Sequence, residues 1–304
     1  MAEPGELAYK EMRVLNFGSL SHDHTNATEH FVKEKETLLS LGYLHNFGGK
    51  GFNQSIAIAR AGMEVCHAGK VGIDGNLLIA YLRDNGVNTD YLDMDEKDIS
   101  GQAFIETCGG ENRIIIYGGA NQLIDDEYID SVLKDFGEED VLLVQNEISD
   151  MGYLIRRAHE KGLKIYFNTA PISQNVFTYP LDLVDFFIVN EVEGKALAGC
   201  AESDYQSILD ALVNKYPGKE FILTVGADGA YYTSQEEMIY VPAEKVDAVD
   251  TTAAGDTFIG YFLAASLQGK SLTDAMVLAT KASALCVSRK GSAQSVPYSE
   301  EITE

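Results

Sequence analysis

Apolar residues follow two different periods along this chain. Short runs rich in β-branched and aromatic residues are typical of buried strands, and longer segments in which apolar residues return every three or four positions are typical of amphipathic helices. The expected strands are residues 13–18, 65–71, 140–144, 164–168, 185–189, 220–225 and 230–233. The expected helices are residues 51–62, 75–85, 149–161, 191–198, 203–216, 255–268 and 271–289.

Strands that alternate with helices at this spacing predict an α/β fold, in which a mostly parallel sheet lies between two layers of helices. Two stretches interrupt the alternation, at about residues 20–48 and 100–118, and both have the extended, glycine-punctuated pattern of hairpins. We interpret them as a small β lid on the main sheet. The predicted organisation is therefore one domain over residues 12–304 that includes this lid, with residues 1–11 as an extension or tag.

The overall charge narrows the classes of partner. The chain has 23 Lys and Arg residues against 47 Asp and Glu residues, which gives a formal net charge of −24. Nucleic acids and anionic membranes need a basic face, so we expect neither as a partner. A phosphorylated small molecule is still compatible with this charge, because backbone N–H groups and Mg²⁺ bind phosphate without basic side chains.

The cysteines and the hydrophobicity profile bear on the cellular compartment. Cys66, Cys108, Cys200 and Cys286 are scattered, with no C-x-x-C pair, which is typical of reduced thiols in a cytoplasmic protein. The apolar runs fall short of the roughly 18 residues that a membrane span needs, and the first residues do not resemble a secretory signal. We expect a cytoplasmic protein.

The segment 250–256, DTTAAGD, precedes a strongly apolar helix. The small residues Ala253, Ala254 and Gly255 leave backbone N–H groups uncovered at the helix start, which favours binding of an anion such as a phosphoryl group. Asp256 in the first turn could accept a proton from an attacking hydroxyl. Acidic residues are also common at helix starts for stability alone, so this segment by itself leaves both interpretations open.

A second segment, GGKGFN at residues 48–53, lies between the expected lid and the next helix. Its glycines allow a ligand close to the backbone, Asn53 can form hydrogen bonds with a polyol, and Lys50 supplies a positive charge. A glycine-rich turn before a helix is more often structural, so this segment alone is weak evidence for a binding site.

Together the two segments make the chain resemble the ribokinase (PfkB) family of carbohydrate kinases. The first family signature is matched by Gly48, Gly49, Asn53, Ser55, Gly62 and Gly72. The second is matched by DTTAAGDTF at residues 250–258, with a small residue at Gly260. The resemblance runs from Met12 to about Ile302, and it implies the ribokinase-like three-layer α/β/α fold.

The resemblance also implies a role for each matched position. It makes Asp256 the catalytic base and Ala253, Ala254 and Gly255 the anion hole. The implied sugar-binding residues are Ser21, Asp23, Gly49, Lys50, Asn53, Glu147 and Asp256. The implied nucleotide-binding residues are Asn190, Thr224, Gly226, Gly229, Gly255 and Thr280. Mg²⁺ would be organised through water by Asn190 and Glu193. K⁺ would be bound by Asp250, Thr252, Cys286, Arg289, Gly291 and Ser295.

The implied reaction is ATP-dependent phosphorylation of a primary hydroxyl of a small sugar, with O5 of D-ribose as the leading candidate. Ser21 stands where family members usually have Asn, and residues 33–37 lack the usual Pro and Gly. These departures leave open a related kinase for fructose, a keto-deoxy sugar acid or a nucleoside. A non-catalytic sugar- or nucleotide-binding regulator is a further alternative, although it would not need Asp256. Exposed edges of the lid strands predict a homodimer formed lid to lid.

Overall fold

The core of the molecule is a nine-stranded sheet. The computed structural model describes residues 12–202 and 204–302. The strand order is β13-β12-β11-β10-β9-β8-β1-β4-β5. The pairs β13–β12 and β12–β11 are antiparallel, and all neighbouring pairs from β11 to β5 are parallel. The strands are β1 (Val14–Phe17), β4 (Val65–Val71), β5 (Asn88–Met94), β8 (Val141–Gln145), β9 (Lys164–Asn168), β10 (Phe186–Asn190), β11 (Glu220–Thr224), β12 (Ala230–Thr233) and β13 (Met238–Val241).

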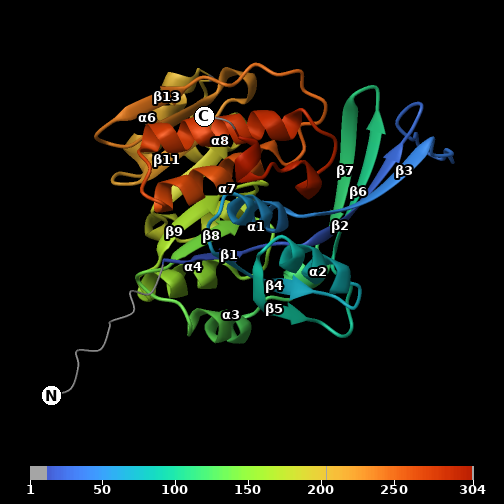
Figure 1. Ribbon diagram of the computed structural model, residues 1–304, viewed down its shortest axis with the longest axis horizontal. Helices are drawn as coiled ribbons and strands as arrows, with labels where there is room; N and C mark the ends of the chain where they lie inside the picture. The colour runs from blue at the N-terminus through green and yellow to red at the C-terminus, as the bar shows by residue number, and fades with distance from the viewer. Residues whose placement is uncertain (1–11, 203, 303–304) are drawn as a thin grey trace.

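Helices cover both faces of this sheet (Figure 1). They are α1 (Lys50–Arg60), α2 (Asn76–Asp84), α3 (Asp126–Leu133), α4 (Met151–Glu160), α5 (Glu191–Ala198), α6 (Tyr205–Lys215), α7 (Ala254–Leu267) and α8 (Leu272–Val287). Short 3₁₀ turns are η1 (Gly119–Gln122), η2 (Gln174–Thr178), η3 (Leu181–Leu183), η4 (Gly226–Asp228), η5 (Ala293–Ser295) and η6 (Ser299–Glu301). One buried cluster joins the sheet to α1, α2, α7 and α8, and a second joins it to α3, α4, α5 and α6. Successive residues of β8 belong to the two clusters in turn, because strand side chains alternate between faces.

The predicted lid is a separate four-stranded sheet that projects from the core (Figure 1). Its order is β3-β2-β6-β7, formed by β2 (Ser21–Ala27), β3 (Gly42–Gly48), β6 (Gly101–Cys108) and β7 (Glu111–Tyr117). Asp23 lies opposite Asn46 and Ala103 and therefore shares a face with them. The neighbouring His24 points to the other face, where its ring stacks on those of His45 and Phe104.

The predicted fold class is confirmed, and most predicted elements lie within one or two residues of the observed ones. The pattern missed β5, α3 and β13, which are short or largely polar. The helix predicted from residue 203 begins instead after Asp204, whose side chain accepts a hydrogen bond from Ser207 N–H at 2.9 Å. Ser203 itself and the extension predicted at residues 1–11 lie outside the described residues.

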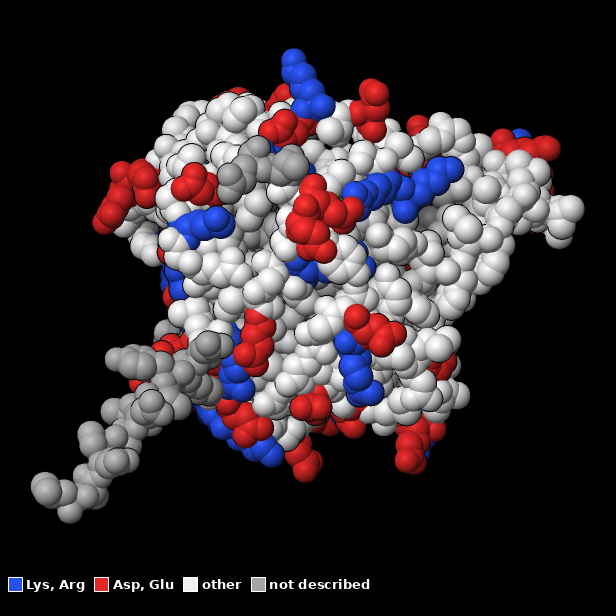
Figure 2. Space-filling view, in the orientation of Figure 1, with Lys and Arg blue, Asp and Glu red and all other residues white. Residues whose placement is uncertain are grey.

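Positive and negative side chains are mixed on the face of the molecule shown in Figure 2, where Lys and Arg are interspersed with Asp and Glu. Over residues 12–202 and 204–302, the structure contains no helix with both the length and the apolar character that a membrane span requires.

Candidate active site

A cleft of about 1280 Å³ lies where the carboxyl ends of several core strands meet the lid. Its lining includes Asp23 and Ile105 of the lid, Lys50 at the start of α1, Thr224 at the end of β11 and Asp256 at the start of α7. In parallel sheets ligands bind at this edge. The volume exceeds the 300–1,000 Å³ or so that is usual for one small ligand, so two molecules can lie side by side in the cleft.

The start of α7 forms one wall of the cleft. Ala253 adopts a left-handed backbone conformation, with φ of 62°, and no side chain caps the helix. A methyl group at Gly255 would meet no atom within 4 Å, so open space lies in front of the first turn. Uncovered N–H groups and the helix dipole make this end of α7 suited to a phosphoryl group, as the sequence predicts.

Two amide side chains hold the carboxylate of Asp256, which is only 8% exposed. Asn53 Nδ2 donates to Oδ2 at 2.9 Å, and Gln54 Nε2 donates to Oδ1 at 2.8 Å. Ser292 Oγ donates to Asn53 Oδ1 at 3.0 Å and so fixes which way the Asn53 amide faces. A carboxylate oriented in this way at an anion site can act as a general base toward a hydroxyl placed in the cleft.

Two carboxylates lie at the lid side of the cleft. Ser21 Oγ donates to Asp23 Oδ1 at 2.8 Å, and burial raises the pKa of Asp23 to about 6, with the negative charge of Glu147 adding to the rise. Glu147 Oε2 accepts hydrogen bonds from the Ser19 hydroxyl and from Lys50 N–H. Carboxylates held in this way can accept hydrogen bonds from sugar hydroxyls.

The side chain of Lys50 lies among three carboxylates. Burial alone would lower its pKa, but the negative charges of Asp256, Glu147 and Glu193 together raise it. The ammonium group therefore stays protonated and adds a positive charge to the lining of the cleft.

The residues predicted for Mg²⁺ form a helix cap. Glu193 accepts hydrogen bonds from Asn190 N–H at 3.0 Å and from Asn190 Nδ2 at 2.9 Å, and Asn190 Oδ1 accepts from Glu193 N–H at 2.9 Å. Burial raises the pKa of Glu193. Because both oxygens of Glu193 already accept a local bond, the pair fits a hydrated Mg²⁺ better than a directly bound one.

The predicted nucleotide-binding residues do not all line the cleft. Asn190, Thr224 and Gly255 are in its lining. The described lining does not include Gly226, Gly229 or Thr280, and the Thr280 hydroxyl donates to the Met276 carbonyl within α8 at 2.9 Å. The nucleotide role of those three positions stays a prediction.

Most residues predicted for K⁺ lie close together beside the start of α7. Asp250 accepts hydrogen bonds from Thr252 N–H at 2.9 Å and from Gly291 N–H at 3.0 Å. Ser295 Oγ donates to the Gly291 carbonyl at 2.9 Å and lies 3.1 Å from Cys286 Sγ. One carboxylate among backbone carbonyls is a donor set that suits K⁺.

Three further observations bear on the metal predictions. The guanidinium of Arg289 pairs with Glu301 at 2.8 Å, so any contribution of this residue to K⁺ binding must come from its backbone. Burial acts to raise the pKa of Asp250, but hydrogen bonds from Thr252 and Gly291 outweigh it and lower the pKa. Within the described part of the chain, no three His, Cys, Asp or Glu side chains form a group that could hold a metal ion.

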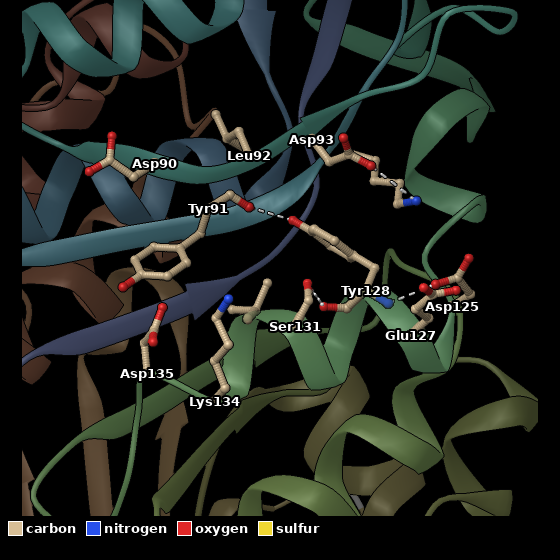
Figure 3. Close-up of a pocket in the computed structure, with 12 residues that line it drawn as sticks. Asp90, Tyr91, Leu92, Asp93, Asp125, Glu127, Tyr128, Ser131, Lys134 and Asp135 are labelled. Atoms are coloured by element: carbon tan, nitrogen blue, oxygen red, sulfur yellow. Dashed lines mark hydrogen bonds and ion pairs between the residues drawn. The ribbon is translucent and has the colours of Figure 1, made fainter.

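A second hollow of about 510 Å³ lies between β5 and α3 and shares no described lining residue with the cleft (Figure 3). Its central polar groups already have partners. Lys70 pairs with Asp93 at 3.2 Å, Tyr128 OH donates to the Tyr91 carbonyl, and Tyr128 N–H donates to Asp125 (Figure 3). Nothing in this hollow matches the chemistry of the cleft.

Three cleft-side groups were not singled out from the sequence: Ser19, Gln54 and Ser292. Gln54 directly follows Asn53 inside a recognised motif, which is the one signal that could have identified it. Ser19 and Ser292 reach the site only because the chain folds, and their local sequence carries no such signal.

The α/β core, the lid and a buried carboxylate at an uncovered helix start are together typical of enzymes that transfer a phosphoryl group to a hydroxyl. The model of the pfkB family carbohydrate kinases matches residues 12–298, and the chain belongs to that family of sugar kinases.

Relatives match the chain over nearly its whole length. Ribokinase from Haemophilus influenzae is 32% identical and covers 94% of this chain and 96% of its own length. Deoxyribokinase from Salmonella typhi is also 32% identical, with 96% and 98% covered. The structure of Arabidopsis thaliana ribokinase complexed with ribose and ATP is 27% identical and has a TM-score of 0.84, with 96% and 97% covered.

Proposed function

We propose that this chain is an ATP-dependent kinase that phosphorylates the 5-hydroxyl of D-ribose. The observation that carries the proposal is the position of Asp256, which Asn53 and Gln54 hold beside the uncovered N–H groups of α7. The relative crystallised with ribose and ATP has the same fold, which supports a cleft for these two substrates.

In this mechanism the sugar lies between Asp23, Glu147 and the start of α1. Asp256 accepts the proton of the hydroxyl as its oxygen attacks the γ-phosphorus. The N–H groups of Ala253 and Gly255 and the ammonium of Lys50 stabilise negative charge on the transferred group, whereas the N–H of Ala254 donates to the Thr251 carbonyl at 3.3 Å. Mg²⁺, when bound, would neutralise the charge of the ATP phosphates, with Asn190 and Glu193 orienting its water ligands. Closure of the lid would exclude water from the cleft.

A second candidate substrate is 2-deoxy-D-ribose. The hydroxyl of Ser21 is engaged with Asp23, so the position at which the family resemblance leads us to expect an Asn amide offers less to the sugar. A relative of equal identity is a deoxyribokinase. Loss of one hydrogen-bonding group weakens the preference for a substrate that has the matching hydroxyl over one that lacks it.

Two assembly features complete the proposal. The lid exposes Leu44, Ile114, Ile115 and Ile116, and β3 and β7 are its two edges, which supports a homodimer formed through the lid. The four cysteines are free, which supports a cytoplasmic location.

The test is ADP release over a panel of D-ribose, 2-deoxy-D-ribose, fructose, a keto-deoxy sugar acid and adenosine, with Asp256→Asn as the control. We expect the highest kcat/KM with ribose and loss of turnover in the variant. Best turnover with another member of the panel would overturn the ribose proposal, and undiminished turnover by Asp256→Asn would overturn the role of the base.

A further inference from the structure

A chain of hydrogen bonds runs from the base into the interior of the protein. It starts at Gln54, whose Nε2 donates to Asp256 Oδ1 at 2.8 Å. Gln145 Nε2 donates to Gln54 Oε1 at 2.7 Å and to Asn16 Oδ1 at 2.8 Å. The chain therefore leaves the cleft and crosses the sheet from β8 to β1.

The chain of hydrogen bonds ends at a histidine. Asn16 Nδ2 donates to Ser55 Oγ at 2.8 Å, and Ser55 Oγ lies 2.7 Å from His67 Nδ1. His67 Nε2 lies 3.3 Å from the carbonyl oxygen of Gly18. Gln54, Gln145, Asn16, Ser55 and His67 are all fully buried.

The direction of every bond in this chain is determined. The Gly18 carbonyl can only accept, so His67 carries its proton on Nε2 and accepts at Nδ1 from the Ser55 hydroxyl. Burial lowers the pKa of His67 to about 4, which keeps the ring neutral and in this role. Ser55 Oγ then accepts from Asn16, and the amides of Asn16, Gln145 and Gln54 each have one permitted orientation.

At the cleft end this direction decides how the Gln54 amide faces Asp256. A flipped Gln54 would place its oxygen against the carboxylate and its NH₂ against the NH₂ of Gln145. Because the chain excludes that state, the NH₂ of Gln54 always faces Oδ1 of Asp256. Asn53, fixed by Ser292, does the same for Oδ2.

Stability alone gives little reason to keep five buried polar side chains in this place. Gln145 Oε1 is buried without a hydrogen-bond partner, which costs stability, and apolar groups of matching shape can replace a buried polar network at little or no cost. This network is unusual in that one end is the carboxylate that performs the chemistry. Its position links the orientation of that carboxylate to the centre of the sheet.

We propose that Gln54 is a positioning residue for Asp256, and that the chain Gln145–Asn16–Ser55–His67 fixes the orientation of its amide. Asp256 touches the reacting hydroxyl, and Gln54 acts through it. This inference rests on the proposed kinase function, because the role of Asp256 comes from there.

The experiment compares three variants with the wild-type protein in steady-state ADP release. Gln54→Leu removes the donor to Asp256. Gln145→Met keeps the size of the side chain but breaks the chain one step behind the donor. Ser266→Ala removes a hydroxyl from α7 outside the chain and serves as the control.

For Gln54→Leu we expect kcat to fall about 10- to 100-fold, the loss that follows when a hydrogen bond to a charged group is removed. The KM values for sugar and ATP should change less than about twofold, because uniform binding is intact. The acid limb of the kcat profile should move to higher pH, since a carboxylate that loses a donor is protonated more easily. For Gln145→Met we expect changes of the same kind but smaller, and for Ser266→Ala none.

A readout without turnover separates this inference from the proposed function. In ¹⁵N-edited NMR spectra the side-chain amide protons of Gln54 should exchange slowly with solvent in the wild type and faster in Gln145→Met. Absence of wild-type turnover on every sugar would overturn the kinase proposal, whereas that exchange rate tests the chain itself. An unchanged exchange rate in Gln145→Met, or an unchanged kcat and pH profile in a folded Gln54→Leu, would overturn the positioning role.

Discussion

Asn53 and Asp256 lie 203 positions apart in the sequence, yet Asn53 Nδ2 donates to Asp256 Oδ2 at 2.9 Å. The two residues are in the first turns of α1 and α7, and these helices pack directly against each other. The hydrogen bond thus joins the two sequence motifs in one site, and the packing of the two helices sets its length.

Replacement of Asn53 should weaken turnover. Asn53→Leu keeps the approximate size of the side chain but removes the donor, and we expect kcat to fall about 10- to 100-fold, because hydrogen bonds to charged groups contribute about 1.5–3 kcal/mol. Asn53→Asp should lower kcat further, since it places a second negative charge against Asp256. ADP-release kinetics measure both effects. A folded Asn53→Leu protein with kcat within twofold of the wild type would contradict this prediction.

Gly260 controls the approach of α1 to α7. A Cβ atom at Gly260 would lie 2.4 Å from Ala57 Cβ and 2.9 Å from the Ala57 backbone carbon, which is too close for either helix to stay in place. We expect Gly260→Ala to lower the free energy of unfolding by about 1–3 kcal/mol and to lower kcat as Asn53 moves away from Asp256. Urea unfolding and ADP release measure the two effects.

Gly137→Ala is the matched control, because a Cβ atom there would meet nothing within 4 Å. Equal stability of Gly260→Ala and Gly137→Ala would show that the helices tolerate the added methyl group.

Binding of the sugar should depend on pH near 6. Burial, with the nearby charge of Glu147, raises the pKa of Asp23 to about 6, so Asp23 gains a proton as the pH falls through that value. A protonated Asp23 loses acceptor capacity for sugar hydroxyls, and KM for the sugar should rise below pH 6. Glu147→Gln should move this rise to lower pH, because it removes a negative charge. KM measured between pH 5 and 8 tests both statements, and a KM independent of pH in the wild type would refute them.

His67 should make the protein sensitive to acid. Burial lowers its pKa to about 4 from the ordinary value of 6.5, so the unfolded chain binds the proton more readily than the folded one. Stability from this group is complete above pH 6.5 and is lost as the pH falls toward 4, by about 3 kcal/mol in total.

His67→Gln provides the comparison, since its amide oxygen can still accept from Ser55. Urea unfolding at pH 7 and pH 5 should show a loss about 2 kcal/mol larger in the wild type than in this variant. Equal losses in the two proteins would mean that His67 does not titrate as its burial implies.

Monovalent cations should affect turnover. The oxygen donors around Asp250 and Gly291 adjoin the start of α7, so K⁺ bound there would strengthen the anion hole. We expect ADP release to fall several-fold when Na⁺ replaces K⁺, and Asp250→Asn to be slow in either salt. Full activity of the wild type in buffer with Na⁺ alone would rule out this role.

The regular alternation of strand and helix made the core sheet predictable from the sequence, since a buried parallel strand needs a continuous apolar run. β5 was missed because Asn88, Asp90 and Asp93 interrupt that run on an edge strand. α3 was missed although its buried residues Ile129, Val132 and Leu133 have helical spacing and Asp125 caps its start.

In the site, too, residues within local sequence motifs could be predicted, whereas partners brought in by the tertiary fold could not. Asp256 and Asn53 lie in motifs that can be read locally, whereas the partners Ser292 and Gln145 come from remote elements. Their role depends on which strands become neighbours, and no local pattern encodes this.

The lid is built from two separate parts of the chain. β2 continues from β1, whereas β6 and β7 follow β5, and β2 and β6 pair in parallel over seven residues. Excision of either part would leave the other with an unsatisfied edge, so the lid cannot be exchanged as one contiguous cassette. Because Asp23 belongs to β2 and lines the cleft, any chimera that takes both lid segments from a relative also takes that relative's residue at this position. An exchange of the lid therefore also changes part of the cleft lining.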